Sequence, residues 1–257
     1  MTQKQKPLIL ITNDDGVQAK GINELIAGVR SLGQIVVIAP DGARSGMSSA
    51  ISSQNPIRLQ LLKQEDDLTI YSCTGTPVDC VKVGVNEILD RQPDLVLAGI
   101  NHGSNSAVCV IYSGTIGATL EGCILGIPSV GVSLCCRHES DADFTQAVRY
   151  GKQVAEKVLA EGLPKGVCLN LNVPQTDDVK GLKVCTQTPG YWIKEFQPAQ
   201  DPFGRPVYWL SGEFLNEDPD NEANDEWALE HGYAALVPLQ LDMTAYSVLD
   251  DFKKSYE

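Results

Sequence analysis

A short apolar run that ends in a polar, glycine-containing turn constrains the fold most strongly. Residues 7–12 read Pro-Leu-Ile-Leu-Ile-Thr, which is typical of a strand buried on both faces, and Asn-Asp-Asp-Gly follows at 13–16. Apolar residues then recur at the spacing of one helix face, at Ile22, Leu25, Ile26 and Val29. A second apolar run at 34–39 completes a strand–helix–strand unit. This unit predicts two parallel strands joined by a right-handed crossover.

The same alternation recurs along the first two-thirds of the chain. The pattern predicts helices near 78–89, 115–125 and 144–158, and strands at 94–100 and 127–134. Regular alternation of this kind predicts an α/β fold with a doubly wound, mostly parallel sheet and helices on both faces.

The pattern changes after Pro174. Short β-like runs follow, with aromatic residues at 191–192 and 208–209, an acidic stretch at 213–230 and a last strand at 232–241. No helix period is evident in this part, and we interpret the acidic stretch as solvated surface. We therefore predict a catalytic core at 1–175 and a β-rich extension at 176–257. The extension would supply an oligomerisation arm or hairpin and return its last strand to the core.

Charge and hydropathy exclude several classes of protein. A net charge of -13 opposes broad contact with nucleic acid, whose phosphates need lysine and arginine partners. No apolar run approaches the roughly 20 residues of a membrane span, and the run at 8–11 is too short for a signal peptide. The eight cysteines lie mostly in apolar runs, without a Cys-x-x-Cys pair. We expect a soluble, cytoplasmic protein with reduced thiols.

Oxygen-bearing side chains follow three of the predicted strands, at 13–15, 41–45 and 101–105. Ligands of open α/β sheets bind outside the carboxyl ends of strands. Adjacent Asp14 and Asp15 would repel each other, and a divalent cation relieves this repulsion. Oxygen ligands favour Mg²⁺, Mn²⁺ or Ca²⁺. The alternative is that one aspartate is the N-cap of a helix and the other lies in its first turn. The spacing of the two residues does not decide between these interpretations.

The segment at 112–118, Tyr-Ser-Gly-Thr-Ile-Gly-Ala, places two hydroxyls and two glycines where a helix is predicted to begin. Free N–H groups at that point could receive a phosphate. Capping of the helix by Ser113 or Thr115 is the alternative, and the segment alone favours it. His102 could donate a proton or orient a phosphate, although a loop histidine is usually only solvated.

Taken in order, these segments resemble the SurE family of metal-dependent phosphatases, also called 5'/3'-nucleotidases. The resemblance rests on Ile-Leu-Ile-Thr-Asn-Asp-Asp-Gly at 9–16, Ala-Pro-Asp at 39–41 with Arg44 and Ser45, and Thr-Gly-Thr-Pro-Val-Asp-Cys at 74–80. It continues through Gly-Ile-Asn-His-Gly-Ser-Asn at 99–105 and the segment at 112–118. The chain departs from the family at 106–111, where Ser-Ala-Val-Cys-Val-Ile stands in place of an acidic run.

The resemblance implies a Rossmann-like core with a swapped C-terminal arm, assembled as a homodimer or homotetramer. It also implies one Mg²⁺ or Mn²⁺ per subunit, held by Asp14, Asp15, Ser45 and Asn101. The catalytic residues expected on this basis are Asp14, Asp15 and Asn101. The residues expected to contact substrate are Asn13, His102, Ser113, Gly114 and Thr115.

The implied activity is hydrolysis of nucleoside 5'-monophosphates, with 3'-monophosphates and short polyphosphate as further substrates. A haloacid-dehalogenase-like phosphatase is a rival, but that class uses an Asp-x-Asp arrangement and here the aspartates are adjacent. A metal- and nucleotide-binding sensor without turnover is the rival outside enzymology.

Overall fold

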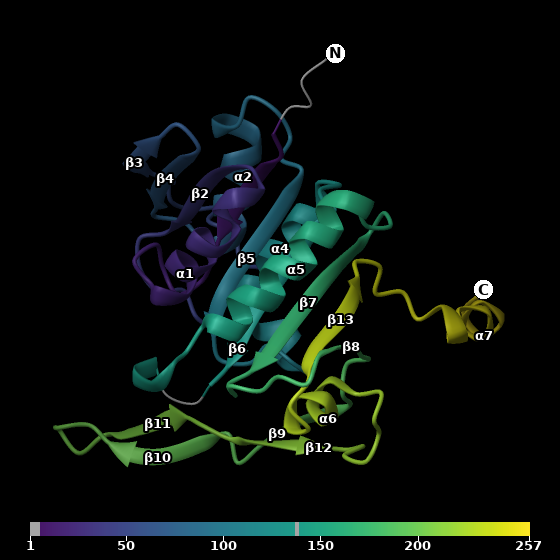
Figure 1. Cartoon of the computed structure of the whole chain (residues 1–257). Coiled ribbons are helices and arrows are strands. Elements are labelled where there is room, and N and C mark those ends of the chain that lie inside the picture. The colour runs from purple at the N-terminus through teal and green to yellow at the C-terminus, as the bar shows by residue number, and fades with distance from the viewer. Residues whose placement is uncertain (1–5, 137–138) are drawn as a thin grey trace.

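A nine-stranded sheet runs through the molecule in the order β3-β4-β2-β1-β5-β6-β7-β13-β8 (Figure 1). The computed structural model describes residues 6–136 and 139–257, so the start of the chain at 1–5 lies outside the described residues. Six neighbouring strands are parallel: β4 (Leu68–Cys73), β2 (Gln34–Pro40), β1 (Leu8–Thr12), β5 (Leu95–His102), β6 (Ser129–Cys135) and β7 (Val167–Pro174). At the edges, β3 (Leu59–Glu65) pairs antiparallel with β4, β13 (Ala234–Gln240) pairs antiparallel with β7, and β8 (Leu182–Val184) pairs parallel with β13.

Helices cover both faces of this sheet (Figure 1). On one face, α1 (Lys20–Val29) and α5 (Thr145–Glu161) share a core with β1, β2, β5, β6 and β7. On the other face, α2 (Pro77–Val83) and α4 (Gly114–Ile124) pack together, and both contribute to a second core. Shorter elements lie at η1 (Arg30–Leu32), η2 (Gly84–Ile88), α3 (Cys109–Tyr112) and η3 (Glu139–Asp141). The predicted doubly wound, mostly parallel α/β fold is confirmed.

The strand order reverses at β1, which lies between β2 and β5. Ile9 pairs with Ile35 on one side and with Leu95 on the other, both in parallel register. Ligands of doubly wound sheets bind at such a reversal, outside the carboxyl ends of the strands. The register of β5 against β6 shifts between Ala98 and Asn101, and pairing resumes through Asn101 and His102. These two residues therefore lie in the strand, whereas the sequence predicted a turn from Asn101 onward.

The segment after β7 contains two small antiparallel sheets. In one, β9 (Gly190–Ile193) pairs with β12 (Glu213–Asn216), and in the other β10 (Phe196–Gln200) pairs with β11 (Pro206–Leu210). Two helices, α6 (Asp225–Glu230) and α7 (Tyr246–Tyr256), also lie here, so the expectation of no helix in this part was wrong. The division of the chain at residue 175 stays a prediction.

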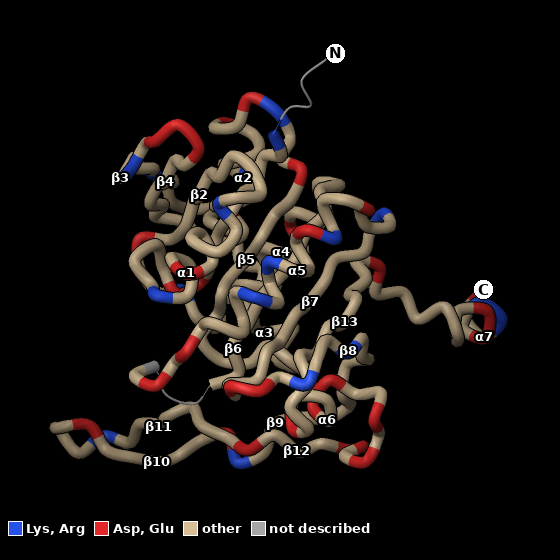
Figure 2. Tube along the Cα trace, viewed as in Figure 1, with Lys and Arg blue, Asp and Glu red and all other residues tan. Residues whose placement is uncertain are grey.

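The acidic stretch at 213–230 runs from β12 to α6 (Figure 2), and it is only partly solvated. Its first part is mostly exposed, as predicted. Asp225, however, has no exposed surface, and Glu226 is partly buried. The interpretation of the whole stretch as solvated surface was therefore wrong at α6, because there the side chains accept hydrogen bonds from other segments.

The cysteines and the helices bear on two further expectations. All eight cysteines are free, and five of them are buried. None of the described helices has the length and apolar composition needed to cross a membrane.

Candidate active site

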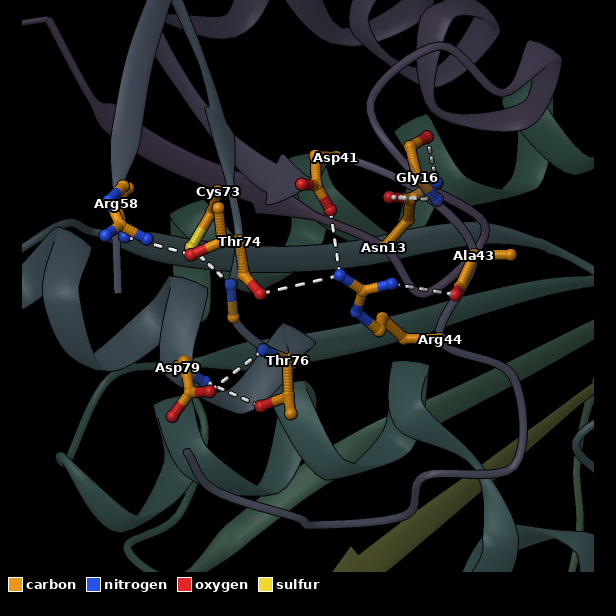
Figure 3. Close-up of polar contacts among 11 residues, drawn as sticks. Asn13, Gly16, Asp41, Ala43, Arg44, Arg58, Cys73, Thr74, Thr76 and Asp79 are labelled. Atoms are coloured by element: carbon orange, nitrogen blue, oxygen red, sulfur yellow. Dashed lines mark hydrogen bonds and ion pairs between the residues drawn. The ribbon is translucent and has the colours of Figure 1, made fainter. Parts of the chain in front are cut away.

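The turn after β1 is closed by its own side chain. Asn13 Oδ1 accepts a hydrogen bond from the Gly16 N–H (3.2 Å), and Asn13 Nδ2 donates to the Gly16 carbonyl (2.9 Å; Figure 3). Gly16 has φ 101°, a backbone region that favours glycine. The turn therefore holds the two aspartates between Asn13 and Gly16 in a fixed direction. Both polar atoms of the Asn13 amide form hydrogen bonds within the turn. The contact of Asn13 with substrate stays a prediction.

Asp14, in the turn after β1, is a buried carboxylate that contacts the start of α4. The residue is only 4% exposed, and its Oδ1 atom accepts a hydrogen bond from the Thr115 hydroxyl (2.7 Å). Burial raises the pKa of Asp14, and the Thr115 hydroxyl and the N–H groups at the start of α4 offset only part of this rise. No Lys or Arg within the described ranges forms an ion pair with Asp14. A cation beside Asp14 would therefore stabilise its charged form.

A hydrogen bond between His102 and Asp15 joins the carboxyl ends of β1 and β5. The His102 N–H donates to Asp15 Oδ2 (3.1 Å), which ties the turn to β5. Asn101 Nδ2 donates to the Gly103 carbonyl (2.8 Å), so Oδ1 is the atom of this amide that is left for a cation. The Nε2 atom of His102 is buried and has no hydrogen-bond partner among the residues that the structure describes.

The loop after β2 brings Ser45 to the same edge of the sheet. The Arg44 N–H donates to the Asp14 carbonyl (2.6 Å), and Ser45 is the next residue. The Arg44 guanidinium donates to Asp41 Oδ1 (2.8 Å) and to the Thr74 carbonyl (3.4 Å), which holds the loop against the end of β4 (Figure 3). Sequence reasoning gave Arg44 no role. In the sequence, only its position next to Ser45 indicated a role for Arg44. The contact with Thr74 was not predictable, because the two residues are 30 positions apart.

The structure decides whether the candidate site residues cap helices, and the result differs between the aspartates and Ser113. Helix α1 begins at Lys20 with Ala19 as its N-cap and without a side-chain cap, so neither Asp14 nor Asp15 caps it. Ser113, in contrast, caps α4, since its hydroxyl accepts a hydrogen bond from the Ile116 N–H (3.1 Å). The contacts of Ser113, Gly114 and Thr115 with a phosphate stay predictions.

A cavity of about 170 Å³ lies beside Asp15 and His102. It is lined by Asp15, Ala19, Lys20, Gly21, His102 and Phe144. Lys20 is the cationic residue of this lining, although its Nζ also donates to the Ala142 carbonyl (2.8 Å). The cavity therefore offers space and one positive charge next to the paired aspartates.

The donor set fits a hard divalent cation. The four predicted ligands, on three segments at the reversal in strand order, would supply two carboxylates, one amide oxygen and one hydroxyl. Within residues 6–136 and 139–257 there is no group of three or more His, Cys, Asp or Glu side chains that could hold a metal. Carboxylate, amide and hydroxyl oxygens favour Mg²⁺ or Mn²⁺ over zinc or copper. The buried Asp14 without an ion-pair partner is the observation that most directly supports a cation here.

The loop at 103–107 is held by residues that the sequence analysis did not single out. The Asn105 N–H donates to Asn172 Oδ1 (2.8 Å), and the Ala107 N–H donates to Asp225 Oδ2 (2.9 Å). These partners are 67 and 118 residues away. The Asn-x-Asn spacing of Asn170 and Asn172 inside an apolar strand was a signal for a buried polar contact, since unpaired amides are costly there.

Known proteins are similar to this chain over nearly its full length. The family model described as survival protein SurE matches residues 9–194. A protein of Phocaeicola vulgatus named 5'-nucleotidase SurE is 52% identical over 251 residues, which cover 98% of this chain and 97% of that protein. A protein of Flavobacterium johnsoniae with the same name is 49% identical and covers 95% of both chains. The crystal structure of the SurE protein from Aquifex aeolicus has a TM-score of 0.83 and 37% identity, over 98% of this chain and 100% of that one.

Proposed function

This chain belongs to the SurE family and is a 5'-nucleotidase, and we propose that it hydrolyses nucleoside monophosphates at a divalent-cation site where β1, β2 and β5 end. The sensor alternative is not favoured, because the relatives are named as nucleotidases. The observation that carries the proposed site is Asp14, a carboxylate 4% exposed at the reversal in strand order and without an ion-pair partner in the described residues.

The proposed ligands are Asp14, Asp15, Ser45 and Asn101. When bound, the cation supplies Lewis-acid polarisation of the phosphate and lowers the pKa of the attacking water. Asp14 or Asp15 orients that water and accepts its proton. The contact from Thr115 and the closed Asn13 turn hold the two aspartates before substrate arrives, which is the preorganisation that catalysis needs.

The chain's own groups bind the phosphate in this proposal. The start of α4, with Ser113, Gly114 and Thr115, faces Asp14 and carries the partial positive charge of a helix N-terminus. His102 lies beside Asp15 and contacts the phosphate or the departing nucleoside. We assign the cavity lined by Lys20 and His102 to the nucleoside.

We propose nucleoside 5'-monophosphates as substrates, with 3'-monophosphates and short polyphosphate as further ones. The test is phosphate release from a panel of these esters by the purified protein, with and without EDTA, followed by addition of Mg²⁺ or Mn²⁺. Release should stop with EDTA and return with either metal. Full activity after chelation would refute the metal-dependent mechanism.

We further propose that the protein is a homodimer or homotetramer. Large apolar side chains on β10 and β11 are exposed, including Phe196 at 62% and Trp209 at 69%. Helix α7 has no buried residue and stands away from the sheet (Figure 1). Exposed aromatic surface of this kind favours an interface with a second copy. Light scattering at micromolar concentration should therefore give a dimer or tetramer, and a monomer would contradict this proposal.

A further inference from the structure

We propose that Asp225 of α6 is a positioning residue for the site: it fixes the loop at 103–107 and through that loop the amide of Asn101. This inference rests on the proposed function, because it assumes that Asn101 binds the cation. Helix α6 packs near β7, at the end of the sheet where the site lies (Figure 1). The C-terminal segment would then complete the site from a distance of more than 100 residues in sequence.

Asp225 is a fully buried carboxylate whose oxygens are both used. Oδ1 accepts hydrogen bonds from the Thr188 N–H (3.0 Å), the Thr188 hydroxyl (2.6 Å) and the Glu226 N–H (2.9 Å). Oδ2 accepts from the Ala107 N–H (2.9 Å). Asp225 forms no ion pair with a described Lys or Arg. The two oxygens therefore bind different segments: Oδ1 binds Thr188 and the start of α6, and Oδ2 binds the loop at 103–107.

The loop needs such external support because of its conformation. Ala107 has φ 48°, a region that residues with a side chain rarely adopt, so surrounding contacts must hold it there. The neighbouring Ser106 hydroxyl is hydrogen-bonded to Glu226, the next residue after Asp225. Two consecutive acidic side chains of α6 thus hold two consecutive residues of the loop.

Between this anchor and Asn101, two further points of the loop are held by hydrogen bonds. Midway along the loop, the Asn105 N–H donates to Asn172 (2.8 Å), and the Asn105 carbonyl accepts from Asn170 (2.8 Å). At its start, the Gly103 carbonyl accepts from Asn101 Nδ2 (2.8 Å) and so orients the amide. A loop that shifts at Ala107 loses one of its fixed ends, and the direction of Asn101 Oδ1 becomes less defined. Residues that hydrogen-bond a metal ligand directly change metal affinity by about 10–100-fold when replaced. Asp225 acts through the loop, so we expect an effect at the lower end of this range.

The test is Asp225→Asn in the full chain, with Mn²⁺ affinity measured by calorimetry. Because Oδ1 accepts three hydrogen bonds and Oδ2 accepts one, the amide keeps its oxygen at the Oδ1 position. Its N–H₂ group then faces the Ala107 N–H, so this contact is lost with little change in size. We expect a cooperative melt, Mn²⁺ binding weaker by roughly tenfold and a raised KM for AMP. Asp225→Ser repeats the test if Asp225→Asn does not fold, since it no longer reaches Ala107 and leaves room for a water.

Thr188→Val is the matched control, because it removes a donor to Oδ1 and leaves the Ala107 contact intact. It should lower the melting temperature without changing the Mn²⁺ affinity. Equal Mn²⁺ affinity in Asp225→Asn and the wild type would overturn the positioning role while the proposed function stands. Equal weakening in Thr188→Val would overturn it too, because the effect would then reflect stability. Absence of Mn²⁺ binding to the wild-type protein would instead refute the proposed function, and this inference with it.

Discussion

Gly114→Ala is a sharp test of how tightly the site is packed. A Cβ atom added at Gly114 would lie 2.8 Å from Asp14 Cβ and 3.0 Å from its Oδ2. Ordinary contact begins near 3.4 Å. Either Asp14 or the start of α4 must therefore move by about 0.6 Å, because Asp14 is buried and its Cβ cannot rotate away.

Two effects of opposite sign act on the stability of this variant. Overpacking costs about 1–3 kcal/mol, and the higher helix propensity of alanine returns up to about 1 kcal/mol. We expect the free energy of unfolding to fall by about 1–2 kcal/mol. Each kcal/mol should lower the melting temperature by roughly 2–4 °C. The effect on catalysis should be larger, because a misplacement of about 1 Å can cost a hundredfold in rate. A shift of about 0.6 Å should reduce kcat/KM by roughly tenfold or more.

The assay is phosphate release from AMP at saturating Mn²⁺, together with a thermal melt. Gly42→Ala is the matched control, since a Cβ at Gly42 meets nothing within 4 Å. The control should keep wild-type kinetics. A folded Gly114→Ala protein with unchanged kcat/KM and unchanged metal response would show that the position of Asp14 is irrelevant to turnover.

Two more substitutions probe charge and pH. Asn101→Asp adds a negative charge to the proposed ligand set, so Mn²⁺ should bind at least as tightly while AMP turnover slows, and faster turnover would contradict the assignment. Asp79 lies in the capping box of α2 with Thr76 (Figure 3). Burial raises the pKa of Asp79, but donors from Ser52 and Thr76 outweigh this and hold its pKa below the usual value. Its stabilising effect is therefore present at neutral pH and is lost as the pH falls below about 4. Urea unfolding of Asp79→Asn should show about 1–3 kcal/mol of destabilisation at pH 7 and less at pH 3, and a constant difference would refute the linkage.

The sequence predicted four of the six parallel strands, because these strands and the helices between them carry strong periodicity, but it did not predict β4 or β7. The first strand, expected at 7–12, is β1 (Leu8–Thr12), and the small-residue helix expected at 115–125 is α4 (Gly114–Ile124). Strand β3 was missed because all but its first residue are exposed, so no apolar alternation marks it. Helix α6 has only six residues, which is too short to show a helical period.

The three strand ends of the candidate site were also found from the sequence, because polar turns after buried strands converge at one edge of a parallel sheet. The contacts within the site were not predictable. Thr115 reaches Asp14 across 101 residues, and His102 reaches Asp15 across 87. The buried Asp225 looked like one more acidic surface residue, since only the tertiary structure supplies the donors that allow a carboxylate to be buried.

The most direct measurement of the central claim is a calorimetric titration of Mn²⁺ into the wild-type protein and into Asp14→Asn. Asparagine preserves the size of the side chain and removes one negative charge from the proposed ligand set, so the fold should survive. We predict one Mn²⁺ per subunit in the wild type and binding weaker by at least roughly tenfold in Asp14→Asn. Equal stoichiometry and equal affinity in the two proteins would contradict a cation site at the end of β1.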